Sequence, residues 1–216
     1  MLSYVFPEIS QESLDNLSLG QQNSLLLRIR NDLFGPDLQS VVTCPRCKEN
    51  LELNFPLLDE QEGNTNIGGE IQLSQGGYDL RFRLPRVKDL IELSEAADVS
   101  SANIEILDRC LIEARYLGES CKTEQLPQEL IEAISELMSE RDPQSNIQLS
   151  ISCPLCHHSW EEDLDIASFL WAEIDAWAYR TLREVHALSL SYGWSEADIL
   201  ALSPLRRRIY LEMVYG

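Results

Sequence analysis

The sequence has few basic residues and no long apolar segment. Lysine and arginine total 17 against 36 aspartates and glutamates, so the formal net charge is -19 at pH 7. A chain of this charge repels phosphate groups, so we expect neither nucleic acid nor anionic lipid as a partner. No uncharged apolar run approaches the ~18–20 residues that span a bilayer, and the start of the chain lacks the basic region of a signal peptide. We therefore expect a cytoplasmic protein without a membrane span.

Common catalytic motifs are also missing. The sequence has no Gly-x-Ser-x-Gly, no glycine-rich phosphate loop and no His-Glu-x-x-His. A zinc deaminase would need a His-x-Glu element, which is absent, and a proline just before its cysteine pair, whereas here the proline lies inside it. These absences favour a non-enzymatic protein. The hydrophobic content of 44% suffices for a sizeable core, in one large domain or two small ones.

The strongest chemical signal is a repeated Cys-Pro-x-Cys, at Cys44–Cys47 and Cys153–Cys156. Two cysteines separated by two residues can direct both sulfurs at one ion, and structural zinc takes four ligands in a tetrahedron. The two pairs are 105 residues apart, far more than the ~15–20 of a compact zinc module. In a reducing compartment such pairs indicate metal or redox chemistry before disulfides.

The flanks of the two pairs explain how they can meet. A shift of 109 residues superimposes the pairs and aligns Val42 with Ile151 and Leu51 with Trp160. Each pair thus has a β run before it and after it, and two such hairpins with their tips together form a zinc ribbon. The predicted ligands of a structural Zn²⁺ are Cys44, Cys47, Cys153 and Cys156. Four sulfur ligands leave no open position for water, so this site would be structural rather than catalytic.

Two alternatives stay open at this site. A thiol redox enzyme also uses Cys-x-x-Cys, although one pair at a helix start suffices for it. His157 or His158, directly after the second pair, could replace a cysteine ligand. Cys110 and Cys121 have no close cysteine partner, and we interpret them as small buried or surface residues.

The predicted fold class is α+β: a split zinc ribbon with an inserted β-hairpin and helices, flanked by N-terminal and long C-terminal helices. Residues 1–37 form an N-terminal helical segment, 38–56 plus 145–164 the ribbon, 57–144 the inserted subdomain, and 165–216 a C-terminal helical segment. The inserted hairpin combines 71–73 with 78–84 around Gly76-Gly77, residues able to adopt positive φ. Residues 58–69 are predicted as a loop and Glu161–Asp163 as an acidic turn. Expected helices cover 10–34 with a break near Gly20, 87–97, 101–117, 127–140 and 166–191, and two short ones begin at Ser195 and Ser203.

The C-terminal helices are the predicted interaction surface. Large apolar residues cover more than one face of 166–191, beyond what a solitary surface helix needs. Aromatic and arginine side chains dominate binding hot spots. The candidate partner-binding residues are Trp171, Trp177, Trp194, Arg206, Arg207 and Arg208.

Four C-terminal stretches resemble the T-even-phage-type baseplate hub assembly protein (chaperone) family, found with contractile phage tails and phage-tail-like contractile injection systems. They are Asp165–Trp171, Leu182–Leu188, Tyr192–Pro204 and Arg206–Leu211. We call each Cys-Pro-x-Cys turn a knuckle: Cys44–Cys47 is the first knuckle and Cys153–Cys156 the second. The second knuckle with the Trp160 that follows it fits the same family, as does the N-terminal helix before the first knuckle. The resemblance is specific over 150–212 and looser over 10–56, and it has no counterpart for 57–145. His157 stands where many relatives have glycine.

The resemblance implies a role in building the baseplate or its hub, without catalysis. It implies baseplate, hub or spike proteins as partners. It also implies a location in the cytoplasm of a bacterial host cell or in the assembled particle. The alternatives are a cytoplasmic zinc-ribbon scaffold for other protein partners and a thiol redox enzyme.

Overall fold

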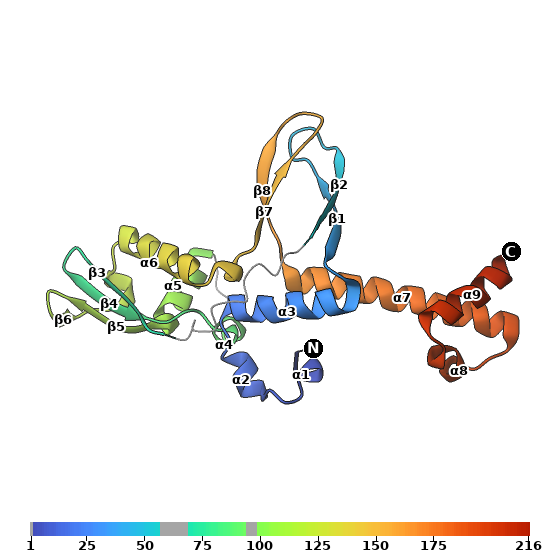
Figure 1. Ribbon diagram of the computed structural model, residues 1–216. Helices are drawn as coiled ribbons and strands as arrows, with labels where there is room; N and C mark the ends of the chain where they lie inside the picture. Colours follow the sequence, from blue (N-terminus) through green and yellow to red (C-terminus); the bar gives the residue numbers. More distant parts are fainter. Residues whose placement is uncertain (1, 57–68, 94–98) are drawn as a thin grey trace. The chain divides into compact units, whose positions relative to one another are not determined.

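The computed structural model describes residues 2–56, 69–93 and 99–216. The chain divides into two compact units, Met1–Ile166 and Ala167–Gly216. Figure 1 labels the helices and strands of each. Helices and strands are mixed, so the predicted α+β class is confirmed. The predicted loop at 58–69 lies, except for Gly69, outside the described residues, as do residues 94–97 of the helix predicted over 87–97.

The N-terminal helices are α1 (Leu2–Val5), α2 (Gln11–Asp15) and α3 (Leu19–Phe34). Ser18 begins α3 with a capping box: its hydroxyl accepts the N–H of Gln21, and the Gln21 side chain accepts the N–H of Ser18. The break predicted near Gly20 is confirmed and lies at residues 16–18. Gly20 itself lies in the first turn of α3.

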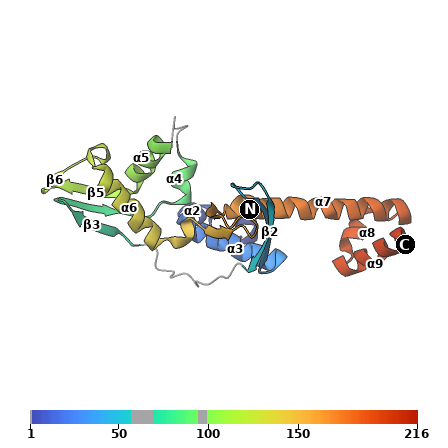
Figure 2. The same ribbon diagram turned by 90° about the horizontal axis from the view of Figure 1, so that it is seen from above.

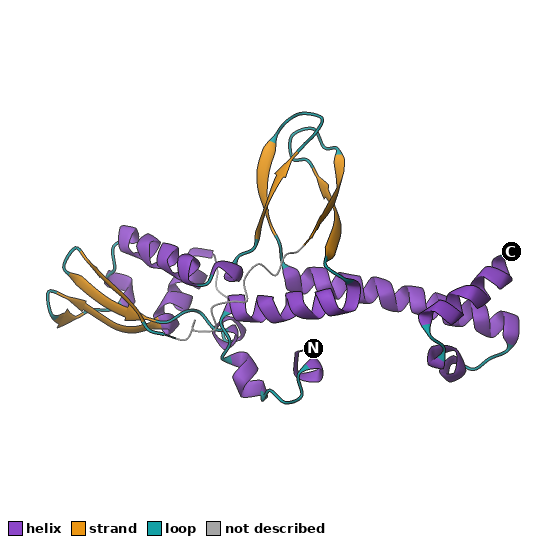
Figure 3. Cartoon of the chain, viewed as in Figure 1, coloured by secondary structure: helices purple, strands orange, loops and turns teal. Residues whose placement is uncertain are grey.

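Two separate antiparallel hairpins form the ribbon. The first joins β1 (Asp37–Thr43) to β2 (Asn50–Pro56), and the second joins β7 (Gln148–Ser152) to β8 (Ser159–Asp163). Their tips lie side by side (Figure 3). Between them is a small apolar core in which the packed or buried residues are Val42, Cys44, Leu51, Leu53, Leu149, Ile151, Cys153, Cys156 and Trp160.

The acidic turn predicted at Glu161–Asp163 is wrong, because these residues continue β8. Glu161 pairs with Ser150 and Asp163 pairs with Gln148. All three acidic residues are exposed, so burial does not oppose the strand. Backbone pairing with β7 overrides the low β propensity of Asp and Glu.

The inserted segment forms a four-stranded antiparallel sheet in the order β3-β4-β5-β6. The predicted hairpin at 71–84 is confirmed as β3 (Ile71–Gln75) and β4 (Tyr78–Phe82), with Gly76 at φ 61° and Gly77 at φ 84°. Two consecutive positive φ angles give the turn that matches the twist of paired strands.

The helix predicted over 101–117 is wrong in its second half. Helix α5 (Val99–Cys110) ends at Cys110, and the chain continues as β5 (Leu111–Tyr116) beside β4, then turns into β6 (Glu119–Ser120). The apolar spacing continues in helical steps through Ala114, so the pattern alone did not reveal the change. Residues 111–116 form a strand because they hydrogen-bond to the edge of β4, whose backbone donors and acceptors would otherwise be unsatisfied.

Helices α5 and α6 (Gln128–Arg141) pack on one face of this sheet (Figure 2). The predicted helix at 127–140 is thus confirmed, while the helix predicted at 87–97 is the shorter α4 (Val87–Ile91). Short 3₁₀ turns, η1 (Thr123–Gln125) and η2 (Pro143–Ser145), flank α6. The fully buried centre of this core is Leu80, Phe82 and Ile134.

The second unit comprises α7 (Ile166–Tyr192), α8 (Glu196–Ala201) and α9 (Pro204–Tyr215), apart from the first residue of α7. The predicted starts are confirmed: Ser195 caps α8 through the N–H of Asp198, and Ser203 caps α9 through the N–H of Arg206. Val185, Leu188 and Ile199 form its buried core. Among the described residues, no helix has the length and apolar character to cross a membrane.

Candidate metal centre

The two knuckles have the same backbone hydrogen bonds. In the first, the N–H of Lys48 donates to the Cys44 carbonyl at 2.9 Å and the N–H of Cys44 donates to the Glu49 carbonyl at 2.8 Å. In the second, the N–H of His157 donates to the Cys153 carbonyl and the N–H of Cys153 donates to the His158 carbonyl, both at 2.9 Å. These bonds correspond at the 109-residue offset and hold each cysteine pair in a tight turn.

One residue in each turn has a left-handed backbone. Lys48 has φ 65° and His157 has φ 56°. This region is costly for a residue with a Cβ and is the ordinary place for glycine. The N–H of this same residue donates to the first cysteine's carbonyl, and its positive φ then turns the chain into the second strand of the hairpin. His157 is therefore a turn residue, and His158 stacks on Trp160 with ring centroids 5.9 Å apart.

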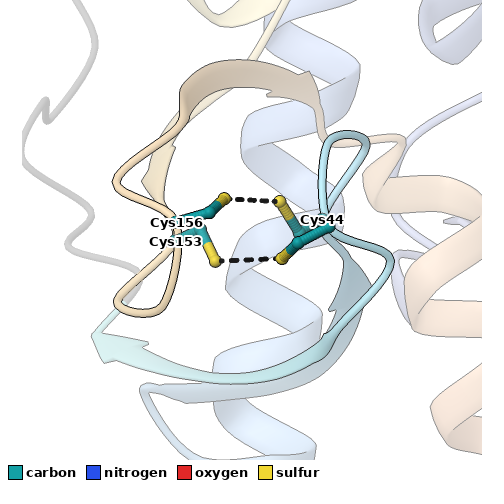
Figure 4. Close-up of side chains that lie close together, drawn as sticks. Cys44, Cys153 and Cys156 are labelled. Atoms are coloured by element: carbon teal, nitrogen blue, oxygen red, sulfur yellow. Dashed lines mark hydrogen bonds between the residues drawn. The ribbon is translucent and has the colours of Figure 1, made fainter.

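The four knuckle cysteines meet at one point between the hairpin tips (Figure 4). The Sγ atoms of Cys44 and Cys156 are 3.7 Å apart, and those of Cys47 and Cys153 are 3.6 Å apart. All four ligand atoms lie within 4.8 Å of one another, and within the described part of the chain this group contains no histidine. Cys110 and Cys121 lie outside it, and burial raises the pKa of the Cys110 thiol to about 11.

These separations suit a tetrahedral metal. With Zn–S bonds of about 2.3 Å, sulfurs at tetrahedral angles lie roughly 3.8 Å apart. A disulfide would need about 2.05 Å, so all four cysteines are free thiols. The chain thus places four soft ligands at a spacing that Zn²⁺ accepts.

The two thiols of the first knuckle, Cys44 and Cys47, have very different pKa values. Burial raises the pKa of Cys44, but hydrogen bonds from the backbone N–H groups of Cys47 and Arg46 outweigh it and lower the pKa to about 6. For Cys47, a hydrogen bond from the backbone N–H of Glu49 lowers the pKa, while desolvation and the sulfurs of the other three cysteines raise it to about 12. Thiols that share so small a space resist ionising together, and a bound cation removes that resistance.

Burial separates the acidic thiol from solvent. Cys44 is 0% exposed and Cys153 is 1% exposed, whereas Cys47 is exposed. A reactive cysteine needs both a low pKa and access. In the first knuckle Cys44 has the lowered pKa and Cys47 has the exposure to solvent. This separation suits metal ligands better than a nucleophile.

The predicted partner-binding residues differ in their surroundings. Trp171 is 59% and Trp177 is 52% exposed, and Trp194 stacks on Tyr192 with ring centroids 4.7 Å apart. Arg207 is buried: its Nε donates to Glu184 at 2.9 Å, and its Nη1 donates to the Leu202 carbonyl at 2.8 Å. Arg206 and Arg208 are exposed.

Sequence reasoning missed two exposed features. One is a row of apolar residues on α9, Leu205, Ile209 and Met213, whose spacing of four residues was a signal in the sequence. The other is an apolar groove between α5 and α6, with Glu132 and Glu136 beside it. No sequence pattern marks that groove, since it depends on how the two helices pack.

A model of the family described as T4 bacteriophage base plate protein matches residues 2–171. The matched range contains both knuckles and the inserted segment, and it ends at Trp171, before most of the stretches that suggested the family resemblance. No curated protein and no solved structure matches the chain.

Proposed function

Because the chain belongs to the T4 bacteriophage base plate protein family, and so has a role associated with the phage baseplate, we propose a more specific function for it. It is a non-enzymatic, zinc-binding assembly factor or adaptor for the baseplate or hub of a contractile, phage-tail-like injection system. The observation that carries the proposal is the family match over 2–171, within which both knuckles lie. Its partners are other baseplate, hub or spike subunits.

The metal in this proposal is Zn²⁺, held by Cys44, Cys47, Cys153 and Cys156. The sulfur separations and the absence of a buried disulfide support it. With four thiolate ligands the ion has no open position, so it stabilises the fold and supplies no chemistry. It joins two hairpins that have no shared strand pairing among the described residues.

The ribbon positions other surfaces in this proposal. The ion fixes the two hairpins to each other, and α3 and α7 directly precede and follow them in sequence. Exposed aromatic and basic residues of the C-terminal unit, Trp171, Trp177, Arg206 and Arg208, then contact other subunits. Trp194 and Arg207 serve mainly the packing of that unit, since their side chains are engaged within it.

Metal analysis of the purified full-length chain tests the zinc site. We expect about one zinc per chain, retained by a Cys110→Ala/Cys121→Ser control and lost when all four knuckle cysteines become serine. Zinc that is absent, or unchanged in the four-cysteine variant, refutes the site. Rapid alkylation of a knuckle cysteine in metal-loaded protein, with disulfide reductase activity, would favour the redox alternative.

The assembly role is tested in cells that produce the whole tail-like particle. Affinity purification of the tagged chain should recover baseplate, hub or spike proteins. Deleting its gene should leave sheaths and tubes without complete baseplates. Complete, functional particles from the deletion strain would contradict the role, and recovery of unrelated host proteins alone would favour the general scaffold.

A further inference from the structure

Helix α9 has an apolar row on its solvent side. Leu205, Ile209 and Met213 are 57%, 41% and 67% exposed. Residues four apart lie on one side of a helix, so these three form a continuous α9 stripe. The opposite side of α9 supplies Tyr210, Leu211 and Val214 to the core of the C-terminal unit. The stripe is therefore not part of that core.

Two arginines flank the α9 stripe. At about 100° per residue, Arg206 and Arg208 project on opposite sides of it. Arg208 is 70% exposed, and its only ion pair among the described residues is with Glu212 at 3.8 Å. The C-terminal unit has 6 acidic and 5 basic residues, in contrast to 30 acidic and 12 basic residues in the first unit.

A groove in the first unit has complementary features. It lies between α5 and α6 and has a volume of about 560 Å³. Its apolar lining residues are Ile106, Leu107, Ile131 and Met138, and polar residues such as Asn103, Gln128 and Ser135 complete the lining. Methionine adapts its shape to incoming apolar side chains. We call this the α5–α6 groove, and its size accommodates the three side chains of one helical stripe.

The wall of the groove is acidic. Glu132 and Glu136 line it from α6 and are exposed. They lie four residues apart, where like charges repel and destabilise a helix. Glu129 and Glu140 extend the acidic side of α6. A cation brought to this wall relieves the repulsion.

We propose that the α9 stripe of one copy of this chain docks in the α5–α6 groove of a second copy. Leu205, Ile209 and Met213 enter the groove, and one flanking arginine meets Glu132 and Glu136. Because an arginine stands on each side of the stripe, either direction of α9 along the groove brings one to the acidic wall. The contact joins two different surfaces, so it can propagate from copy to copy and close into a ring if the geometry permits.

Charge selects this arrangement over pairing of two α9 stripes. Stripe against stripe would place arginines of the two copies beside each other, whereas stripe against groove places them beside carboxylates. The contact involves one short helix and one groove, so we expect weak association that depends on concentration, as for interfaces below roughly 1,200 Å². It is independent of the metal and adds self-assembly to the proposed baseplate role.

Charge-reversal variants of the full-length, zinc-loaded protein test the proposal by sedimentation velocity over a wide concentration range. Wild type is expected to form dimers and larger species that dissociate as salt is raised. Arg206→Glu/Arg208→Glu and Glu132→Arg/Glu136→Arg each weaken association by roughly tenfold or more. An equimolar mixture of the two variants associates again, since each variant's altered surface meets an opposite charge on the other.

Two further variants separate the docking surface from general stickiness. Ile209→Glu, within the α9 stripe, abolishes association. Leu190→Glu, at a 75% exposed position on α7, leaves it at the wild-type level. A wild-type chain that stays monomeric throughout, or a Glu132→Arg/Glu136→Arg variant that associates as wild type does, overturns the proposal. Zinc content and recovery of baseplate proteins are measured separately, so either result leaves the proposed function to its own tests.

Discussion

The backbone N–H of Gly20 donates a hydrogen bond to Oδ2 of Asp142 at 2.9 Å, across 122 positions of the chain. Gly20 lies in the first turn of α3, where N–H groups lack helical partners and attract negative charge. Asp142 is 2% exposed and directly precedes η2. Asp142, the C-cap residue of α6, therefore also caps the start of α3, the helix that leads into the first hairpin.

A Gly20→Ala substitution should destabilise the protein, although alanine normally favours helices. A Cβ at this position would lie 1.9 Å from Oδ1 of Asp142. We expect the free energy of unfolding to fall by about 1–3 kcal/mol, the usual cost of overpacking. Urea denaturation measures it. Gly69→Ala is the matched control, since nothing lies within 4 Å of its Cβ position, and an equal loss in both variants would contradict the explanation.

Glycine at the left-handed turn positions should stabilise the protein. Lys48→Gly and His157→Gly each relieve a left-handed conformation that costs about 1–2 kcal/mol, less the greater backbone entropy of glycine, about 0.5–1 kcal/mol. Thermal denaturation of zinc-loaded protein should show a small rise in Tm for each. Arg46→Gly, at a position in the same turn without positive φ, should lower Tm. Loss of zinc from His157→Gly would instead identify His157 as a ligand.

Zinc binding should release protons at pH 7.5. Cys47 is protonated in the metal-free chain, since its pKa is about 12, and it must ionise to bind the metal. Cys44, with a pKa of about 6, is already a thiolate and loses its metal affinity as pH falls through that value. Calorimetric titration with zinc in buffers of different ionisation enthalpy counts the protons. A count of zero would show that Cys47 does not become a thiolate ligand.

The ion pair of Arg83 with Asp89 should make the free energy of unfolding depend on pH in the acidic range. Nη1 of Arg83 lies 2.6 Å from Oδ2 of Asp89, a carboxylate whose side chain is 4% exposed. Burial raises the pKa of Asp89, but hydrogen bonds from Arg83 and the N–H of Arg86 outweigh it, so the pKa is lowered from 3.8. The stabilisation is full above pH 3.8 and is lost as pH falls through the lowered value.

The matching variant is Asp89→Asn. At pH 7 it should lose about 3 kcal/mol of unfolding free energy, because Arg83 keeps its charge without its partner. The difference from wild type should shrink as pH falls below 3.8 in a series of urea titrations. A constant difference at every pH would show that the charge of Asp89 is not what stabilises this region.

Arg207 should matter for stability, whereas its two neighbours should not. Arg207→Gln breaks the pair with Glu184 beside the core of the C-terminal unit, and we expect a loss of about 2 kcal/mol. Arg206→Gln and Arg208→Gln, at exposed positions, should change stability by less than about 0.5 kcal/mol. Hydrogen exchange of α7 and α9 amides resolves the effect in this unit. Equal losses of stability in all three variants would contradict the special role of Arg207 in packing.

Local chemistry explains what the sequence predicted well. The repeated Cys-Pro-x-Cys and its matching flanks predicted two hairpins that bring four sulfurs together, because β alternation and turn residues are local signals. The serine caps and the Gly76-Gly77 turn were predictable for the same reason. Glu161–Asp163 and the second half of 101–117 were mispredicted because strand pairing with distant partners decided them. The hydrogen bond between Gly20 and Asp142 joins residues 122 positions apart, so no local sequence pattern indicates it.

The two knuckles of the ribbon are also synthesised at different times. A ribosome that adds about 5–20 residues per second exposes the second knuckle roughly 5–20 seconds after the first. Throughout that interval the nascent chain has two sulfur ligands, and two do not complete a tetrahedral site. A product that stops before Cys153 stays in that state permanently. Stable retention of the metal would therefore mark those molecules whose synthesis has passed the second knuckle.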